Sequence, residues 1–410
     1  MDSDSKGHRF ESCRVRQTSY LFAARALRDF GDGFVTILLP VYLLALGFSP
    51  LQVGVLATAS LLGSALLTIA VGILGVRHDL RRLLLAAACL MVATGTAMSV
   101  VTDYALLLVV ACAGTVNPSA GSVSIFVPLE HAVLAREVGD ADRTRMFARY
   151  SLVGALASTL GALAAALPDA RAFVGLGQLT AIKLMFVLYA IVGVAGALLY
   201  SRIPTRLPNR EAPEAATALG PSRAIVLKLA ALFSLDAFAG GFVVQSLLAL
   251  WLFERFDLSL SEVGVFFFWT GVLSAFSFPI AAWLSRRIGL INTMVFTHIP
   301  SSIALMLAAF APTLPLVLIL LMIRAALSQM DVPTRSSYVM AVVTEAERAA
   351  AASFTSVPRS LAAAASPALA GALFATSFRA WPLLICGTLK IVYDLLLLLQ
   401  FRHHKPPEER

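Results

Sequence analysis

The stretch ALRDFGDGF at residues 26–34 places three charged side chains inside an apolar segment that continues as VTILLPVYLLALGF. A second stretch, SLDAFAGGF at residues 234–242, repeats its pattern, with Leu, Phe, Gly and Phe at corresponding positions. At another corresponding position the charge changes sign, because Arg28 in the first stretch corresponds to Asp236 in the second. The two stretches predict a duplicated chain that places ionisable groups inside apolar helices.

The amino-acid composition is that of an integral membrane protein. Of the 410 residues, 59% are hydrophobic and 14% are charged, and the mean hydropathy is +0.82. Soluble proteins are about 45–50% apolar and about 25% charged, so the composition excludes a soluble globular domain. The N-terminal residues before the first apolar segment are polar and lack a compact apolar core with a small-residue cleavage site, so no cleaved signal peptide is expected.

Twelve segments of the chain are long and apolar enough to be transmembrane helices, which need about 20 residues each. The sequence therefore predicts an all-α integral membrane protein with twelve transmembrane helices. The predicted spans are 20–46, 51–75, 82–101, 105–135, 143–167, 179–201, 224–254, 261–284, 290–310, 314–342, 348–376 and 380–401.

Positive charge is unevenly distributed over the two sides of the predicted membrane. The formal net charge is +8, and most Lys and Arg residues between the spans share a side with the N-terminus, whereas the other side holds Arg171, Arg255 and Arg379. Cytoplasmic loops carry the excess of Lys and Arg, so we expect both termini in the cytoplasm and the protein in the cytoplasmic membrane. The basic residues are expected to meet anionic lipid, and no nucleic-acid partner is expected.

Two further matches support the duplication. Residues 126–143 match 331–348, and residues 51–55 match 261–265, at nearly the same spacing as the opening pair. A polar interval rich in Pro, Ala and charge separates six spans from six and reads as a flexible linker. Because each half has an even number of spans, the halves are expected to run parallel. We predict an N-terminal six-helix bundle at 1–200, a cytoplasmic linker at 201–223 and a C-terminal six-helix bundle at 224–410.

The predicted span 314–342 carries a polar stripe. Arg324, Ser328, Asp331 and Arg335 are spaced by four, three and four residues, which places them on one face of a helix. An ionisable side chain inside a membrane costs about 2.5–3.5 kcal/mol on insertion scales and is a functional hypothesis by default. We therefore expect this face to line a central, water-filled cavity rather than to meet lipid.

Other ionisable residues lie at comparable depth in other spans. A helical rise of 1.5 Å per residue places Asp32, Asp236 and Arg359 near the middle of the membrane, and Glu130 nearer its inner side. The candidates for proton coupling or for lining the cavity are Arg28, Asp32, Glu130, Asp236, Arg324, Asp331, Arg335 and Arg359.

Two roles stay open for these charges. Asp32 or Asp331 is a candidate proton carrier or substrate ligand, because a carboxylate in a poorly hydrated cavity binds protons in the working pH range. Alternatively the charges form salt bridges, Arg28 with Asp236 and Glu130 with Arg335, that close a cytoplasmic gate or neutralise one another. In addition, Asp29 is expected to pair with Arg25, and Lys390 and Asp394 are expected to pair or to snorkel near helix ends.

The layout and three motifs carry a family resemblance. GILGVRHDLRR at 72–82 is similar to a loop motif at Gly72, Arg77 and Arg81, with Val76 and Asp79 departing from it. LLMIRAALSQ at 320–329 is similar to an arginine motif of exporters, with Arg324 in that role, and SLAAAASPALAG at 360–371 is similar to a Gly-Pro-rich antiporter motif. On these residues the chain resembles the major facilitator superfamily over essentially its whole length. The resemblance implies two pseudo-symmetric six-helix bundles around a central cavity, a latch at the loop motif, a monomer, and ion coupling, most often to protons.

The first hypothesis for function is a secondary active transporter that moves a small-molecule substrate by alternating access, coupled to protons and directed outward. One alternative is uptake of a small organic metabolite coupled to protons or another ion. A second, of a different class, is a non-transporting receptor or scaffold on a transporter fold. An enzyme is not favoured, because the chain has no HExxH, GxSxG or GxxxxGK[ST] motif. No cofactor and no metal site are expected.

Overall fold

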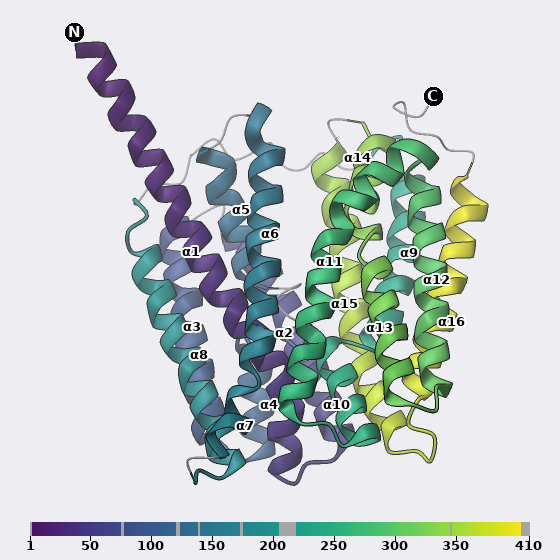
Figure 1. The fold of residues 1–410 in the computed structure, drawn as a ribbon. Helices are drawn as coiled ribbons and strands as arrows, with labels where there is room; N and C mark the ends of the chain where they lie inside the picture. The colour runs from purple at the N-terminus through teal and green to yellow at the C-terminus, as the bar shows by residue number, and fades with distance from the viewer. Residues whose placement is uncertain are drawn as a thin grey trace.

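The structure, a computed structural model, describes residues 2–74, 78–119, 124–137, 140–172, 175–204, 219–344 and 347–402. Over these ranges the regular secondary structure is helical, without a strand, so the prediction of an all-α membrane protein is confirmed (Figure 1). The helices are α1 (Asp2–Ala45), α2 (Pro50–Leu74), α3 (Leu80–Val100), α4 (Tyr104–Ala113), α5 (Phe126–Glu137), α6 (Asp140–Ala164), α7 (Leu167–Ala172), α8 (Gln178–Tyr200), α9 (Arg223–Gly241), α10 (Gln245–Phe256), α11 (Leu260–Ile288), α12 (Leu290–Phe310), α13 (Leu314–Ser328), α14 (Asp331–Val342), α15 (Arg348–Phe374) and α16 (Trp381–Phe401).

Three predicted spans are each divided into two helices. The span 105–135 becomes α4 and α5, the span 224–254 becomes α9 and α10, and the span 314–342 becomes α13 and α14. The first two breaks follow Gly114 and the pair Gly240–Gly241, and glycine costs about 1 kcal/mol relative to alanine inside a helix. The third break has a different cause, because Pro333 has no N–H to donate to the carbonyl of Gln329 four residues earlier.

Among the described residues, nine helical segments are long and apolar enough to cross a membrane by length and composition. The helices over the predicted spans 20–46, 105–135 and 348–376 are not among these nine. The protein is therefore an integral, multi-pass membrane protein, and the number of twelve spans stays a prediction. The helix α1 also begins at Asp2, well before the predicted start of the first span.

The helices lie in two groups (Figure 1). The first helix group, α1–α8, occupies one side of the molecule, and the second helix group, α9–α16, occupies the other, with both chain termini at the same end. Contacts between the groups run chiefly between α2 and α15 and between α6 and α11, with α1 against α10. The exact bundle boundaries at 1–200 and 224–410 stay a prediction, because residues 205–218 of the predicted linker lie outside the described residues.

Small residues let the helices of the two groups approach closely. A Cβ atom added to Gly371 on α15 would lie 2.6 Å from the carbonyl oxygen of Pro50 and 3.0 Å from the Cα atom of Gly54, at the start of α2. In lipid there is little hydrophobic drive between helices, so close van der Waals packing over small residues holds them together. Glycine is therefore required at this crossing for steric reasons.

Hydrogen bonds also join the two groups. The Asp169 carboxylate on α7 accepts from the backbone N–H and from the hydroxyl of Ser261, at 2.9 and 3.0 Å. The Ala368 N–H on α15 donates to the Thr58 hydroxyl on α2, at 3.0 Å. The helix α7 lies at the end of the molecule opposite the termini (Figure 1). The two groups are thus linked at the end away from the termini.

Candidate functional site

The predicted site residues gather in two separate clusters of buried charge. The first charge cluster lies in the first helix group and consists of Arg25, Arg28, Asp29, Asp32 and Glu130. The second charge cluster lies in the second helix group and consists of Asp236, His298, Asp331, Arg335, Lys390 and Asp394.

Arg28 on α1 is the central cation of the first charge cluster. Its guanidinium lies 3.1 Å from Glu130 and 3.3 Å from Asp29, and it donates to the Ser124 hydroxyl at 2.9 Å. The guanidinium also stacks over the Phe126 ring, 4.8 Å from its centroid. Arg28 therefore bridges α1 and α5 with its charge compensated and several of its N–H groups bonded.

Glu130 on α5 is fully buried and fully partnered. Besides Arg28, its carboxylate accepts hydrogen bonds from the hydroxyls of Tyr150 and Tyr200, which come from α6 and α8. The sequence-based prediction missed both tyrosines, because a tyrosine inside an apolar span reads as packing. A buried Tyr hydroxyl needs a hydrogen-bond partner, and this need could have indicated that the two tyrosines lie near a buried polar group. A buried carboxylate with this many partners serves to join helices.

Asp32 differs from the other carboxylates of the first charge cluster. It is 2% exposed, and its side chain accepts a hydrogen bond from the Tyr189 hydroxyl at 3.2 Å. That hydroxyl also lies 3.0 Å from the Thr115 hydroxyl. Within the described ranges no cation lies at ion-pair distance from Asp32, because Arg28 on the preceding turn is held by Glu130 and Asp29. The cluster has three carboxylates and two guanidiniums, and Asp32 is the unpaired carboxylate.

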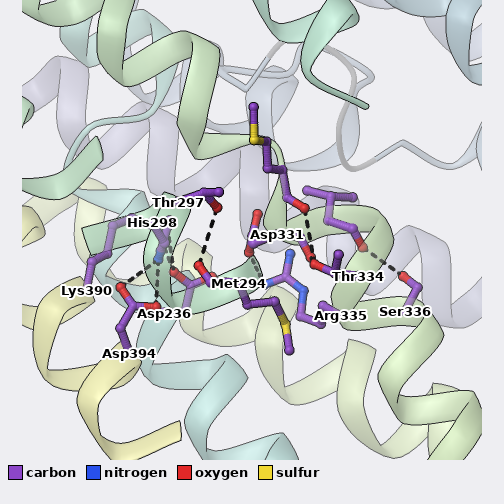
Figure 2. A network of polar contacts seen from close by, with 12 residues as sticks. Asp236, Met294, Thr297, His298, Asp331, Thr334, Arg335, Ser336, Lys390 and Asp394 are labelled. Carbon is purple, nitrogen blue, oxygen red and sulfur yellow. Dashed lines mark hydrogen bonds and ion pairs between the residues drawn. The ribbon is translucent and has the colours of Figure 1, made fainter. Parts of the chain in front are cut away.

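Asp236 on α9 is the central anion of the second charge cluster (Figure 2). Its carboxylate accepts from Arg335 at 3.0 Å and from the Lys390 ammonium at 2.6 Å. Arg335 also lies 3.3 Å from Asp331, one turn earlier on α14. The ion pairs of Asp236 therefore connect α9 with α14 and with α16.

His298 on α12 extends the second charge cluster, and the prediction missed it (Figure 2). Its Nδ1 atom lies 3.0 Å from the carboxylate of Asp394, and its Nε2 atom lies 3.2 Å from the Lys390 ammonium. Lys390 and Asp394 pair as expected, but with partners in the protein interior rather than by snorkelling at helix ends. Their spacing of four residues, which puts both on one face of α16, is the signal that could have revealed the cluster.

The gate salt bridges considered between the repeats, Arg28 with Asp236 and Glu130 with Arg335, are not formed in this structure. Arg28 pairs with Glu130, and Asp236 pairs with Arg335, so each pair closes within one helix group. The physical reason is that equivalent positions of two repeats occupy equivalent places in different bundles, and such places need not meet. The predicted pair of Arg25 and Asp29 is confirmed, at 2.7 Å.

The remaining predicted residues lie outside both ion-pair networks. Arg324 on α13 is half-buried, and Arg359 on α15 is exposed; within the described ranges neither forms an ion pair. Gly72 is exposed, with open space where a Cβ atom would be. The backbone N–H of Arg81 donates to Asp79, which caps α3, and Arg77 lies outside the described residues. The predicted latch at this loop therefore stays a prediction.

A metal site is not found in the part of the chain that the structure describes. No group of three His, Cys, Asp or Glu side chains there is placed to hold a metal ion. The chemistry that the two clusters offer is the binding of protons and the pairing of charges inside a membrane.

The chain is similar to known proteins over most of its length. Residues 21–298 and 229–410 match the model of the Major Facilitator Superfamily. An uncharacterized membrane protein of Saccharomyces cerevisiae, YJR124C, is 23% identical over 424 aligned residues, which cover 95% of each chain.

Solved structures give the same architecture. The nucleoside transporter NupG is similar with a TM-score of 0.71 at 13% identity, over 95% of this chain and 99% of that one. The xylose transporter XylE from E. coli, in an inward-open conformation, is similar with a TM-score of 0.72 at 14% identity, over 98% of both chains. At this identity the likeness shows the fold alone.

Proposed function

Because the chain belongs to the major facilitator superfamily, we propose that it is a proton-coupled secondary transporter that exports a small solute by alternating access. The two helix groups are proposed to rock about the contacts between α2 and α15 and between α6 and α11, as the bundles of such a fold do. The observation that carries proton coupling is Asp32, a buried carboxylate without a cation.

Asp32 is suited to carry a proton because of its surroundings. Burial without an opposite charge favours the neutral form of a carboxyl group, and a bound proton removes the surplus negative charge of the first charge cluster. Asp331, the other candidate, is paired with Arg335 at 3.3 Å. We therefore assign the coupling role to Asp32 and a structural role to Asp331.

The paired charges support the same mechanism in another way. Arg28 with Glu130 ties α1 to α5, and Asp236 with Arg335 ties α9 to α14. Each tie stays within one helix group, so rocking of one group against the other does not have to break it. We propose that these pairs keep each group rigid while Asp32 gains and loses its proton.

The outward direction rests on α15. Its stretch around Ser366, Pro367 and Gly371 is similar to the antiporter motif, and the Ser366 hydroxyl donates to the Phe238 carbonyl at 2.6 Å, which anchors α15 to α9. Uptake of a small organic metabolite is the alternative. NupG and XylE, which share the fold, are described as transporters of a nucleoside and of xylose. A receptor or scaffold on the same fold would bind its ligand without flux.

The proposal includes a location and an orientation. The excess of Lys and Arg on the side of the N-terminus supports cytoplasmic termini and insertion in the cytoplasmic membrane. In that orientation the end at which Asp169 contacts Ser261 faces outward, and the contacts described here close the outer side. We further propose that the protein works as a monomer in contact with anionic lipid.

Transport in inside-out membrane vesicles tests the proposal. The vesicles are energised to be acid inside and read with a pH-sensitive dye, and a panel of lipophilic cations, organic acids and metalloid anions is added. A transported compound is expected to discharge the gradient in the wild type but not in Asp32→Asn. The control is Glu262→Gln, which changes an exposed carboxylate at the start of α11.

Each outcome of this assay has a meaning. Discharge by Asp32→Asn at the wild-type rate would show that Asp32 is not the proton carrier. Failure of every compound in the folded wild type would contradict proton-coupled export for these compound classes, and the same panel in right-side-out vesicles would then test uptake.

A further inference from the structure

Arg324 lies on the face of α13 that points into the protein. Ile319 and Ile323 are exposed and mark the lipid face, whereas Val317 and Leu321 are buried. At 100° per residue, Arg324 stands on the side of Val317 and Leu321, away from the lipid face. Its side chain is nevertheless half-buried rather than buried. Part of the Arg324 side chain is therefore accessible on the side of α13 that lies away from the lipid face.

The charge of Arg324 has no protein counter-ion in the described part of the chain. The carboxylates of the second charge cluster already have partners. Asp236 pairs with Arg335 and Lys390, and Asp331 pairs with Arg335. Asp394 is in contact with His298. Cys386 on α16 is close enough to interact electrostatically with Arg324, but a buried thiol is neutral and compensates nothing.

Arg359 repeats the pattern on α15. It shares a helical face with Ser366 and Ala370, which are fully buried, yet Arg359 itself is exposed. It interacts electrostatically with the charges of Asp236, Asp331 and Arg335 but forms no ion pair in the described ranges. Arg324 and Arg359 are therefore two guanidiniums of the second helix group that no carboxylate of the described ranges pairs with.

A guanidinium inside a membrane cannot lower its cost by losing its proton, because arginine stays charged in proteins. Since no carboxylate of the described ranges pairs with Arg324, an anionic ligand from outside the chain can supply the compensating charge. A carboxylate or phosphate group matches the guanidinium fork with two parallel hydrogen bonds. Arg324, without an ion pair in the described ranges, lies in the second helix group, whereas Asp32, the carboxylate without an ion pair there, lies in the first.

We propose that Arg324 binds the anionic group, a carboxylate or a phosphate, of the solute that this protein transports, and that Arg359 attracts the anion into the interior. This inference rests on the proposed function and adds the class of the substrate to it. An organic acid is thus a substrate, whereas a lipophilic cation is repelled by the second helix group.

Thermal unfolding of the purified full chain in detergent tests the site without requiring transport. The probes are sodium benzoate and sodium phosphate, with sodium chloride at matched ionic strength as the reference and tetraphenylphosphonium chloride as the cationic probe. A ligand that binds only the folded state raises the unfolding temperature. At least one of the two anions is expected to raise it in the wild type, and tetraphenylphosphonium is expected not to.

Arg324→Gln removes the charge, and Arg324→Lys keeps the charge but removes the fork. Loss of a charge-assisted pair is expected to weaken apparent affinity for the anion about 10- to 100-fold in Arg324→Gln, with a smaller loss in Arg324→Lys. The matched control is Arg286→Gln, the same substitution at an exposed arginine of α11, and it is expected to keep the wild-type shift. If Arg324→Gln does not fold, the loss in Arg324→Lys relative to the control decides.

Three results would overturn the proposal. The first is an anion shift that persists in both Arg324 variants, which would place the anion elsewhere. The second is a shift with tetraphenylphosphonium alone, which would assign a cationic substrate and leave the transporter function standing. The third is an unfolding temperature that none of the probes changes, while the same wild-type protein discharges a pH gradient in vesicles with a compound that is not an anion. A larger rise of the unfolding temperature with benzoate than with phosphate indicates a carboxylate ligand, and the reverse indicates a phosphate ligand.

Discussion

At the scale of single residues, the interior charges divide into those that the protein compensates and those that it does not. Arg28, Glu130 and Asp236 each have two or more polar partners within the protein. Asp32 and Arg324 lack a charged partner in the described ranges. A compensated charge holds helices together, whereas an uncompensated charge needs a proton or a solute. The partner of each charge, rather than its presence in a span, therefore separates structural from functional residues.

The first prediction concerns the pair of Arg28 and Glu130. Arg28→Met leaves the buried carboxylate of Glu130 without a guanidinium, and breaking a buried pair from one side costs about 3–5 kcal/mol. We expect a large fall in unfolding temperature for Arg28→Met and a smaller one for the double variant Arg28→Met with Glu130→Gln. Thermal unfolding in detergent measures both, with Arg286→Met as the exposed control. Glu130→Gln alone completes the cycle, and a loss in the double variant equal to the sum of the two single losses would mean that the two residues are not coupled.

At the scale of helices, breaks and crossings shape the site. The break between α13 and α14 lies between Arg324 and Asp331, and the break between α9 and α10 follows Gly240 and Gly241, close to Asp236. Each break allows the helix to change direction where the polar groups of the interior begin. The glycines at helix crossings have a different effect, because they set how closely two helices approach each other.

The second prediction concerns the crossing of α2 and α15. Gly371→Ala places a methyl group against Pro50 and Gly54, so the helices must separate, at a cost of about 1–3 kcal/mol. We expect a lower unfolding temperature and slower transport. Gly196→Ala on α8 is the control, because nothing except the Tyr200 ring, at 4.0 Å, lies near an added Cβ atom. Wild-type behaviour of Gly371→Ala would show that the crossing is looser than described.

The third prediction concerns Glu347, which lies before α15 and ties it to the start of α9. Hydrogen bonds from Ser222, Thr344 and Gly220 hold the pKa of Glu347 at about 2, below its usual value of 4.5. A lowered pKa in the folded state means that the ionised group stabilises the fold above pH 4.5 and that this contribution is lost as the pH falls toward 2.

We therefore expect the unfolding temperature of the wild type to fall more steeply between pH 5 and about 3 than that of Glu347→Gln. The comparison isolates this group, because all other carboxylates titrate in both proteins. Parallel curves for the two proteins would contradict the assigned role of Glu347.

At the scale of the whole molecule, the two helix groups are asymmetric in charge and in contact. The first group has a buried carboxylate, Asp32, without an ion pair in the described ranges, and the second has two guanidiniums, Arg324 and Arg359, without one. Contacts between the groups include the pair of Asp169 and Ser261 at the end away from the termini. For rocking between the groups to open that end, this pair must separate.

The fourth prediction is that a cross-link at this pair stops transport. Asp169→Cys and Ser261→Cys are combined in a background whose four native cysteines are replaced by Ser, and the thiols are joined by a short bifunctional reagent. Flux is expected to cease on cross-linking and to return on reductive cleavage. Each single Cys variant treated with the same reagent is the control. Full transport by the cross-linked protein would contradict a rocking mechanism that opens this end.

The sequence by itself determined the class of the fold and the duplication. Apolar segments of about 20 residues dictate membrane helices whatever their neighbours, because the bilayer leaves few alternatives for the backbone. The repeated stretches around Arg28 and Asp236, and the stripe from Arg324 to Arg335, likewise follow from order and spacing along the chain. These features are local, so the sequence displays them directly.

Only the tertiary structure decided which charge meets which. One of the two roles left open by the sequence pairs Arg28 with Asp236, whereas in the structure Arg28 pairs with Glu130 and Asp29. His298 joins the second cluster from α12, and Tyr189 and Tyr200 join the first from α8, two helices on which the sequence shows no stripe of charged residues. Ion pairing depends on separations of a few ångströms between helices, and these are set by packing at glycines and by breaks at proline and glycine rather than by position in the chain.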